Sequence, residues 1–584
     1  MLVWTKAQKR LPKQGSRLYT FLMQRPGLQR PLESERVSDA SAPASMSAPS
    51  GQPKLLLSKF ALTVAGATAF TILFLVYAAM AKLLVLHPDQ AHPSLYAQAI
   101  LDGNVFLRGW ELTTVTFYTE IPLYMIAIKL IGLNADLMRV VPAFIHTVNI
   151  FLLGGLIWKY RTREGIWMFL PFVILAVMPA GGLWTYGLFG PMHHVTTSCG
   201  FLVLMLLNRD LALDRFSRTS LAVAGVGLVG TWGDLAFLFV FAMPVAFACL
   251  YAHRDHPDLQ SRAGLLVALP LLMGSVVGQL IVMGMRSLGL GTPGGLEHNM
   301  FVRSNEVLGK VFATLEGWME LFFPSVWGRP GNLATMAALM LALGFWWWLR
   351  AMYWAVLSRR AAAIDVLCAV MPIAVFAMVV ATKRQGWVNE VRMLIPAYLM
   401  GVFLVCRWWQ DQPNPRRNAW ALVLMGIGAV ILTFNFFRFN NVVADDASAG
   451  RYRRMAVFLE QRGLTKGHAD YWSAPLVMVA SGNRVRLSPL LDSGDVLSPY
   501  YWGSSIQSYV GWRSRFMLIR GQSDNPDEGP HSRLAHERAA TQYWGEPKER
   551  YEVEGMVVLV WDKDKEVRPH EYPPNLVRRI KFGL

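Results

Sequence analysis

Long apolar runs dominate the chain up to about residue 440. The first goes from about Leu55 to Leu86, and further runs follow it at short intervals. Because about 20 apolar residues cross a bilayer as one helix, the pattern predicts a mostly α-helical, polytopic membrane protein of about eleven spans. The later spans are expected at residues 139–158, 165–187, 195–208, 219–233, 235–252, 263–285, 331–350, 362–381, 393–407 and 419–437.

The two ends of the chain carry a different pattern. Residues 1–54 are basic and then rich in Ser, Ala and Pro, which predicts a disordered tail. Residues 55–441 form the expected transmembrane domain. Residues 442–584 alternate short apolar runs with Pro, Gly and charge-rich turns. We expect a small α/β domain there, with the runs LVMVAS and EGMVVLVWD as strands.

Composition agrees with a membrane protein and the charges orient it. Of 584 residues, 53% are hydrophobic and 16% charged, and the formal net charge is +17. Basic clusters at the predicted span ends all fall on one side, as the positive-inside rule requires if the N-terminal tail is cytoplasmic. Much of the net charge is therefore topological, and no nucleic-acid partner is expected. An odd number of spans places residues 442–584 outside the cytoplasm.

The four cysteines lie inside apolar runs, and no two of them form a CxxC pair. They are Cys199, Cys249, Cys368 and Cys406. This distribution excludes a disulfide framework and a thiolate zinc site.

The first outer loop, residues 87–138, contains the most informative acids. Asp89 directly follows the first span, and an amphipathic helix with Leu95 on its apolar face comes next. Glu120 precedes a Pro-started apolar segment that is too short to span comfortably. We expect two interfacial helices that present both acids to one membrane-level cavity. For Asp89 alone, helix capping remains an alternative, because Asp and Pro often stand together at helix starts.

These segments resemble the GT-C glycosyltransferases, in particular the bacterial aminoarabinose transferase of lipid A and the protein O-mannosyltransferases. The matching stretches are PDQAHPSLYAQAILDGN, FYTEIPLYMIAIKLIGLNADLMRVVPAF and, less closely, WGDLAFLFVFAMP. The resemblance covers roughly residues 55–250, the later spans by topology only and the C-terminal region hardly at all. The chain has Asp89-Gln90 where members often have Asp-Glu, and Pro-Met-His-His at residues 191–194 where the lipid A enzyme has an Asp.

The resemblance implies that a sugar is transferred from a polyprenyl-phosphate donor to a glycan, lipid or protein acceptor, outside the cytoplasm and at a bacterial inner membrane. Position by position, Asp89 matches the catalytic base and Glu120 the acid of the family's Phe-Glu-Lys-Pro-like motif. The chemistry fits these residues independently of the name. A lipid phosphate is already a good leaving group, so the protein must deprotonate an acceptor hydroxyl and neutralise phosphate charge.

Cations on the outer side, where the positive-inside rule predicts few, are candidates to hold the donor phosphate. Lys383, Arg384 and Arg392 lie in the loop between the ninth and tenth predicted spans, and Arg303 lies in the second long outer loop, residues 286–330. Arg392 is the best single candidate, because a guanidinium binds phosphate bidentately. Snorkelling to the interface, or pairing with Glu390, is the alternative for Arg392.

Three further residues are candidates for the acceptor or for a metal. His193 and His194 stand together at an outer span boundary, where they are either structural or ligands of a divalent metal. Asp234, in the WGD turn between two closely spaced spans, is either a helix N-cap or a cavity-lining acid. No cofactor is required by this chemistry.

Two other functions compete with the transferase. In a transporter or flippase of lipid-linked saccharides, Asp89, Glu120 and Asp234 would be coupling or binding charges. A polysaccharide polymerase or ligase would use nearly the same chemistry as the transferase. The position of the acids at the outer boundary, away from the bilayer midplane, favours the transferase.

Overall fold

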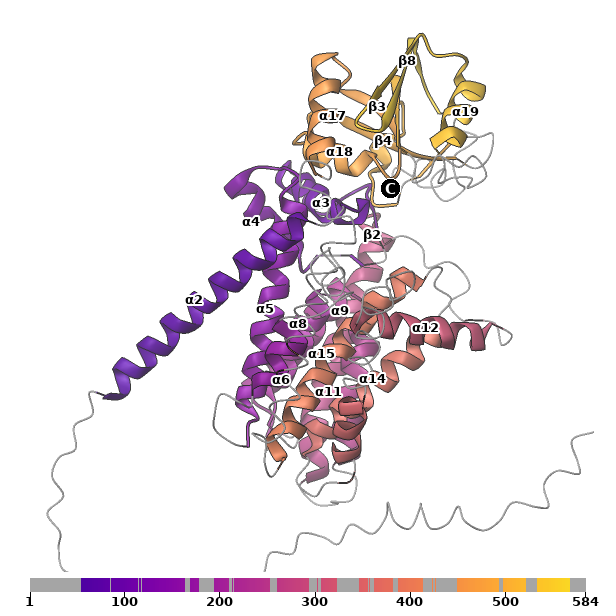
Figure 1. Ribbon diagram of the computed structural model, residues 1–584. Coiled ribbons are helices and arrows are strands. Elements are labelled where there is room, and N and C mark those ends of the chain that lie inside the picture. The colour runs from indigo at the N-terminus through magenta and orange to yellow at the C-terminus, as the bar shows by residue number, and fades with distance from the viewer. Residues whose placement is uncertain are drawn as a thin grey trace, which may run out of the picture. The chain divides into compact units, whose positions relative to one another are not determined.

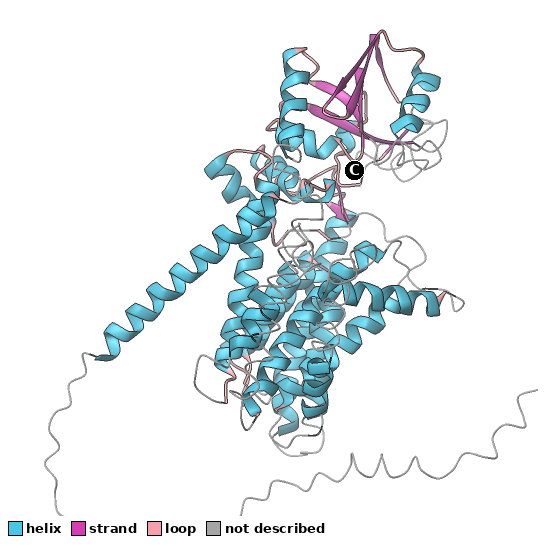
Figure 2. Cartoon of the chain, in the orientation of Figure 1, coloured by secondary structure: helices cyan, strands magenta, loops and turns pink. Residues whose placement is uncertain are grey.

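The protein, seen as a computed structural model, is mostly helical with a small mixed sheet (Figure 2). The structure describes residues 54–83, 86–113, 115–116, 118–162, 169–177, 194–208, 213, 215–252, 260–293, 302, 306–322, 346–355, 357, 362–381, 387–412, 423, 426, 449–492, 497–500, 502–520 and 533–567. The chain divides into two compact units, Met1–Val64 and Ala65–Leu584. The predicted tail, residues 1–54, lies outside the described residues except for Lys54.

Four described helices are long and apolar enough to cross a membrane, which does not support the predicted count of eleven. They are Ala61–Lys82, Leu137–Lys159, Gly264–Ser287 and Ala363–Ala381. Helices do form at most of the other predicted positions, but several are short. The helix α9 (Arg218–Gly233) has 16 residues and α10 (Met243–Ala252) has 10. The predicted spans at 331–350 and 419–437 lie largely outside the described residues.

The helices of the predicted transmembrane domain follow one another along the chain, as Figure 1 shows. Other helices, most of them shorter, lie between and after the membrane-length helices. The helices are α2 (Lys54–Lys82), η1 (Pro88–Gln90), α3 (His92–Leu101), α4 (Ile121–Ile131), α5 (Leu137–Lys159), α6 (Leu170–Phe172), η3 (Val173–Val177), α8 (His194–Leu206), α9, η4 (Leu238–Ala242), α10, α11 (Gln260–Ser287), α12 (Val307–Phe322), α14 (Ala363–Ala381) and α15 (Trp387–Asp411).

Glycines let α9 and α11 approach each other at backbone distance. Gly274 and Gly278 form a GxxxG pair on α11; a Cβ at Gly278 would lie 2.5 Å from the carbonyl oxygen of Leu228, and one at Gly274 would collide with that of Ala224. From the other side, a Cβ at Gly227 would lie 2.6 Å from the Leu271 carbonyl oxygen. Small residues are what helices need for close packing in lipid, where burial of apolar side chains gives little driving force.

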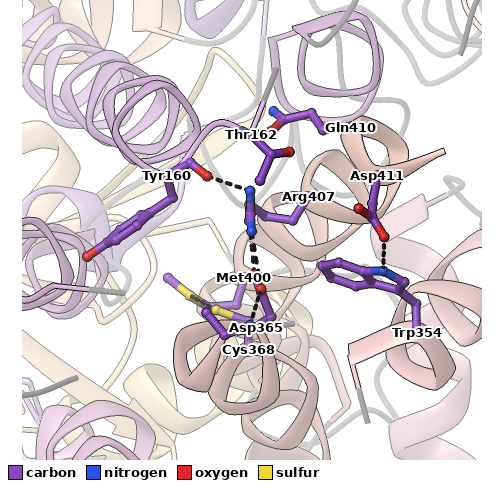
Figure 3. A network of polar contacts seen from close by, with 10 residues as sticks. Tyr160, Thr162, Trp354, Asp365, Cys368, Met400, Arg407, Gln410 and Asp411 are labelled. Atoms are coloured by element: carbon purple, nitrogen blue, oxygen red, sulfur yellow. Dashed lines mark hydrogen bonds and ion pairs between the residues drawn. The ribbon is translucent and has the colours of Figure 1, made fainter. Parts of the chain in front are cut away.

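A buried ion pair joins three helices (Figure 3). Arg407 on α15 donates to both carboxylate oxygens of Asp365 on α14, at 3.0 and 3.3 Å, and also to the carbonyl oxygen of Tyr160 at the end of α5. Both charged side chains are almost completely buried. Asp365 also accepts from the amide of Ala362 at 2.8 Å. The pair therefore meets the requirement that a buried charge have both a counter-ion and further hydrogen bonds.

The C-terminal region contains a six-stranded mixed sheet in the order β5-β4-β3-β6-β8-β7. Its strands are β3 (Lys466–Asp470), β4 (Arg486–Asp492), β5 (Leu497–Pro499), β6 (Ser514–Ile519), β7 (Glu549–Val553) and β8 (Met556–Lys565). Helices α17 (Ala449–Gln461) and α18 (Ala474–Ala480) pack on one face and α19 (Arg533–Trp544) on the other (Figure 1). The predicted α/β architecture is confirmed.

One of the two predicted strands is wrong. EGMVVLVWD falls on β8, as expected, but LVMVAS forms the helix α18. Pro475 stands in the first turn of α18, where proline favours a helix start, and five of its seven residues are buried. A short segment that is buried on nearly all sides has no polar face, so its hydrophobic pattern does not distinguish helix from strand.

The Asp365–Arg407 pair predicts a clear pattern of stability. Asp365→Ala leaves a buried guanidinium without its counter-ion, and Arg407→Leu leaves a buried carboxylate, so each should cost about 3–5 kcal/mol of unfolding free energy. The double variant should be more stable than either single one, because no uncompensated charge remains. Thermal unfolding in detergent measures this, with Asp411→Asn, which keeps an acceptor for Trp354, as a milder control. Additive losses in the double variant would contradict the pairing.

Candidate active site

The first outer loop folds as the sequence predicts, into two helices that precede α5. The helix α3 follows Asp89 within two residues, and α4 begins directly after Glu120. The helix α4 has 11 residues, which confirms that this apolar segment is too short to span a membrane. A two-residue strand, β1 (Glu111–Leu112), pairs with β2 (Thr292–Pro293), so the first and second outer loops are joined by backbone hydrogen bonds.

Asp89 is not the helix cap. It lies within the short helix η1, whose cap is His87: the Nδ1 of His87 accepts from the Asp89 amide at 3.3 Å, and Gln90 accepts from the His87 amide at 2.8 Å. The Asp89 carboxylate therefore does not serve as the cap of this helix. His87 Nδ1 also lies 3.5 Å from Asp89 Oδ2, a contact that becomes an ion pair when the imidazole is protonated.

The closest partner of the Asp89 carboxylate comes from the C-terminal domain. Tyr471, which directly follows β3, donates its hydroxyl hydrogen to Asp89 Oδ1 at 2.8 Å. The same hydroxyl oxygen lies 3.2 Å from Nε2 of His92. Since the single phenol proton points at Asp89, His92 must be the donor in the second hydrogen bond, which fixes the proton of its neutral ring on Nε2.

Aromatic rings hold this chain of polar groups in place. His92 stacks between Tyr96 and Tyr471, with centroid distances of 6.1 and 5.9 Å, and Tyr471 meets Tyr500 edge-on at 4.6 Å. Gly503 lies against the His92 ring with φ +71°, and any side chain there would collide with the imidazole. Burial lowers the pKa of His92 to about 4 and raises the pKa of Tyr471 well above its ordinary value. Both groups are therefore neutral at physiological pH.

Glu120 lies in a second polar group, next to Asp234. Its side chain is 2% exposed, and burial together with the charge of Asp234 raises the pKa of Glu120 to about 8, despite an opposing hydrogen bond from the Val195 amide. Like charges in a buried site disfavour double ionisation, so Glu120 is mostly protonated at neutral pH. The charged group that acts on Glu120 is therefore Asp234, whereas the Asp89 carboxylate contacts Tyr471 and His87.

The WGD turn holds Asp234 and receives the first outer loop. Asp234 Oδ1 accepts from the Ala236 amide at 2.9 Å, and Oδ2 accepts from the hydroxyl of Thr196. Asp234 is 6% exposed. The hydroxyl of Thr116 donates to the carbonyl oxygens of Trp232 and Gly233 at 2.7 and 2.9 Å. Asp234 is therefore the C-cap residue of α9 and a buried acid whose carboxylate bonds within and across the turn, and its role as a cavity-lining acid stays a prediction.

Aromatic side chains connect the two polar groups. Tyr96, which stacks on His92, accepts from the Thr113 amide at 3.3 Å and interacts electrostatically with Asp89 and with Tyr118. Tyr118 in turn stacks on Trp232, two residues before Asp234, at 5.3 Å. The loop thus carries Asp89 and Glu120 on a single packed layer, each with its own partners.

The other candidates are described only in part. His194 begins α8 and is buried, with its ring 6.2 Å from that of His146. His193, Arg303, Lys383 and Arg384 lie outside the described residues, and Arg392 belongs to α15 but its side chain is not described. Among the residues that are described, no three His, Cys, Asp or Glu side chains are grouped as a metal site. All four cysteines are buried and unpaired, as their positions predict.

Sequence reasoning missed Tyr471 and Thr196. Tyr471 lies 382 positions from Asp89, in a domain for which the loop pattern carries no information. Thr196 is one of two adjacent threonines in an apolar run, where a hydroxyl usually bonds to its own helix. Comparison with protein-family models and with curated proteins found no match for the chain.

The pKa of Glu120 predicts how stability depends on pH. In the unfolded chain the carboxyl ionises near its ordinary value, whereas in the folded protein it stays protonated up to about pH 8. Unfolding therefore releases a proton between these values, and Glu120 makes the protein less stable as pH rises through that window. Glu120→Gln imitates the protonated form. The midpoint temperature of thermal unfolding of this variant should therefore exceed that of the wild type by several degrees at pH 8.5 and by little at pH 5.

Thermal unfolding of the purified protein in detergent at the two pH values measures this difference. Glu546→Gln is the matched control, because Glu546 is exposed and its substitution should leave the pH dependence unchanged. A neutral Glu120 would be contradicted if the unfolding midpoint of Glu120→Gln lay below that of the wild type by the same amount at both pH values.

Proposed function

We propose that the protein is a GT-C-type glycosyltransferase that moves a sugar from a polyprenyl-phosphate donor to an acceptor hydroxyl, with Asp89 as general base. The observation that carries the proposal is the environment of the Asp89 carboxylate. One oxygen is held by Tyr471 at 2.8 Å, while the side chain keeps 24% of its surface exposed. A base must be both fixed in direction and reachable by its substrate, and this carboxylate has both properties.

In the proposed reaction, Asp89 accepts the proton of the acceptor hydroxyl as its oxygen attacks the anomeric carbon. The bond from that carbon to the phosphate oxygen breaks, the electron pair leaves with the lipid phosphate, and the configuration inverts. Tyr471 and His92 stay neutral and keep Asp89 in position. Arg392, with Lys383, Arg384 and Arg303, is proposed to neutralise the leaving phosphate, and His193, His194 and Asp234 to border the acceptor.

Glu120 has a positioning role in this proposal. Its buried, mostly neutral carboxyl lies on the loop that Thr116 joins to the WGD turn by hydrogen bonds to the carbonyl oxygens of Trp232 and Gly233. Because the same loop carries Asp89, this anchor fixes the base relative to the helices. We therefore assign Glu120 to the support of the site, not to proton transfer from substrate.

The topology belongs to the same proposal. About eleven spans, a cytoplasmic N-terminus and a C-terminal domain in the periplasm of a bacterial inner membrane would place Asp89 and Tyr471 on the outer face together. The four membrane-length helices, and further apolar helices at the predicted positions, support a membrane location. The positive-inside distribution of the basic clusters supports the orientation.

Replacement of the base is the first test. Asp89→Asn keeps the shape and an acceptor for Tyr471 but cannot take a proton, so transfer from a panel of short polyprenyl-phosphate sugars should fall by about 10²–10⁴-fold. The assay uses the full chain in nanodiscs with radiolabelled donors. Asp102→Asn, at the exposed end of the neighbouring helix α3, is the matched control. Full turnover by Asp89→Asn would refute the mechanism, and saccharide movement across the bilayer without bond formation would favour the flippase.

Tyr471→Phe tests whether the C-terminal domain positions the base. The substitution keeps the ring contacts with His92 and Tyr500 but removes the hydrogen bond to the ionised carboxylate. Proton uptake by Asp89 then becomes easier, so the acidic limb of the kcat/KM profile should move to higher pH, with a fall in kcat of about tenfold. Tyr353→Phe, at an exposed position, is the control. An unshifted limb would mean that Tyr471 has only a packing role.

A further inference from the structure

The C-terminal sheet has a carboxyl edge, which is the edge where its parallel strands end. In open α/β sheets this edge is where ligands bind. Strands β4, β3 and β6 run parallel, and the chain passes from β3 to β4 on one side and returns to β6 on the other. The strand order therefore reverses at β3. In such sheets, ligands bind outside the carboxyl ends of the strands at the point of reversal. Asp470 ends β3, and Arg520 directly follows β6, at this edge.

The carboxylate of Asp470 is fully occupied by local donors. It accepts from the Ser473 amide at 3.1 Å, from the Ser473 hydroxyl at 2.9 Å and from the Arg520 amide at 2.6 Å. It is completely buried. Asp470 thus fixes the turn that leads to Tyr471 and holds the backbone, not the guanidinium, of Arg520.

Two guanidinium groups meet at the same edge on one phenol. Arg451 donates from Nη2 to the Tyr452 hydroxyl at 3.0 Å, and Arg520 donates from Nη1 to the same oxygen. Their Cζ atoms lie 4.8 and 5.7 Å from the centre of the Tyr452 ring. Tyr452 itself is completely buried at the start of α17. We call this group the arginine pair.

The arginine pair differs from the other arginines around it. Within the described part of the chain, Arg453 pairs with Asp136 at 2.8 Å and Arg454 pairs with Glu554 at 2.7 Å. Both lie on α17, the helix that also carries Arg451. More exposed arginines of the domain have carboxylate partners as well: Arg484 with Glu460, Arg513 with Glu566, and Arg550 with Glu537. Neither member of the arginine pair has an ion-pair partner among the described residues.

The two guanidiniums share a single phenol oxygen. Burial and the neighbouring charge of Arg451 lower the pKa of Arg520, while Tyr452 and the charge of Asp470 act in the opposite direction. The Nε of Arg451 is buried and has no hydrogen-bond partner among the described residues. An anion with several acceptor oxygens would bridge both guanidiniums and satisfy the remaining donors, and phosphate is the group whose geometry matches a guanidinium bidentately.

We propose that Arg451 and Arg520 form a phosphate-binding site on the C-terminal domain. The elements that carry the site also contact the first outer loop, since Arg453 on the same helix pairs with Asp136 and Tyr471 beside Asp470 reaches Asp89. The ligand is a phosphate group, carried either by a lipid or by a soluble molecule. This inference does not depend on the transferase, since it concerns binding and not turnover.

The test measures binding by the full chain in detergent. In detergent, inorganic phosphate is titrated and compared with chloride at equal ionic strength. In a second arm, the chain in nanodiscs that contain phosphatidic acid is compared with the chain in nanodiscs of phosphatidylcholine alone. The readout in both arms is the midpoint temperature of thermal unfolding. Stabilisation by inorganic phosphate identifies a site for soluble phosphates, and stabilisation by phosphatidic acid alone identifies a lipid-borne one. In either case Arg451→Gln and Arg520→Gln should each weaken the response at least tenfold in apparent Kd.

Two further variants separate binding from folding. Arg513→Gln removes an exposed arginine that pairs with Glu566, so its response should equal that of the wild type. Tyr452→Phe keeps both guanidiniums and removes only their shared acceptor, so phosphate should still bind. The proposal is overturned if neither phosphate source stabilises the wild type, or if Arg451→Gln and Arg520→Gln respond as the wild type does.

Discussion

The hydrogen bond from Tyr471 to Asp89 is the contact on which the proposed site depends. It joins the loop that follows the first predicted span to a domain that begins more than 350 residues later in the chain, and it fixes one oxygen of a carboxylate whose other side stays exposed. Around it, His92, Tyr500 and Gly503 leave little freedom for either partner. A base on a loop gains direction only from such support, so the C-terminal domain is part of the site and not an appendage.

The acids and bases of the helical domain show three ways to bury a charge. Asp365 keeps its charge because Arg407 supplies a counter-ion and further donors. Glu120 loses its charge, since burial beside Asp234 makes the protonated form the stable one. Asp234 is buried with donors from Thr196 and Ala236. The counter-ion of Asp365 and the protonation of Glu120 each avoid an uncompensated buried charge, which would cost roughly several kcal/mol in a nonpolar environment.

Local patterns predicted what local forces decide. The helix after Asp89, the short helix after Glu120 and the strand β8 follow from periodicity, proline and length within one segment. The strand predicted at LVMVAS was wrong, because the residues of α18 are buried on nearly all sides and carry no periodic signal. The structure does not support the predicted number of spans, because some apolar runs form helices too short to cross a membrane, as on both sides of the WGD turn. No pattern announces that Tyr471 will meet Asp89, because only the folded chain brings them together.

Charge pairing also explains why the carboxyl edge of the sheet differs from the rest of the C-terminal domain. Six of the twelve described arginines there lie against carboxylates: Arg453, Arg454, Arg484, Arg513, Arg533 and Arg550. Arg451 and Arg520 instead share the Tyr452 hydroxyl at the point where the strand order reverses, next to the turn that positions Tyr471. Because Asp470 binds both the Ser473 amide in the turn after Tyr471 and the backbone amide of Arg520, one buried carboxylate supports the contact to Asp89 and the position of the arginine pair.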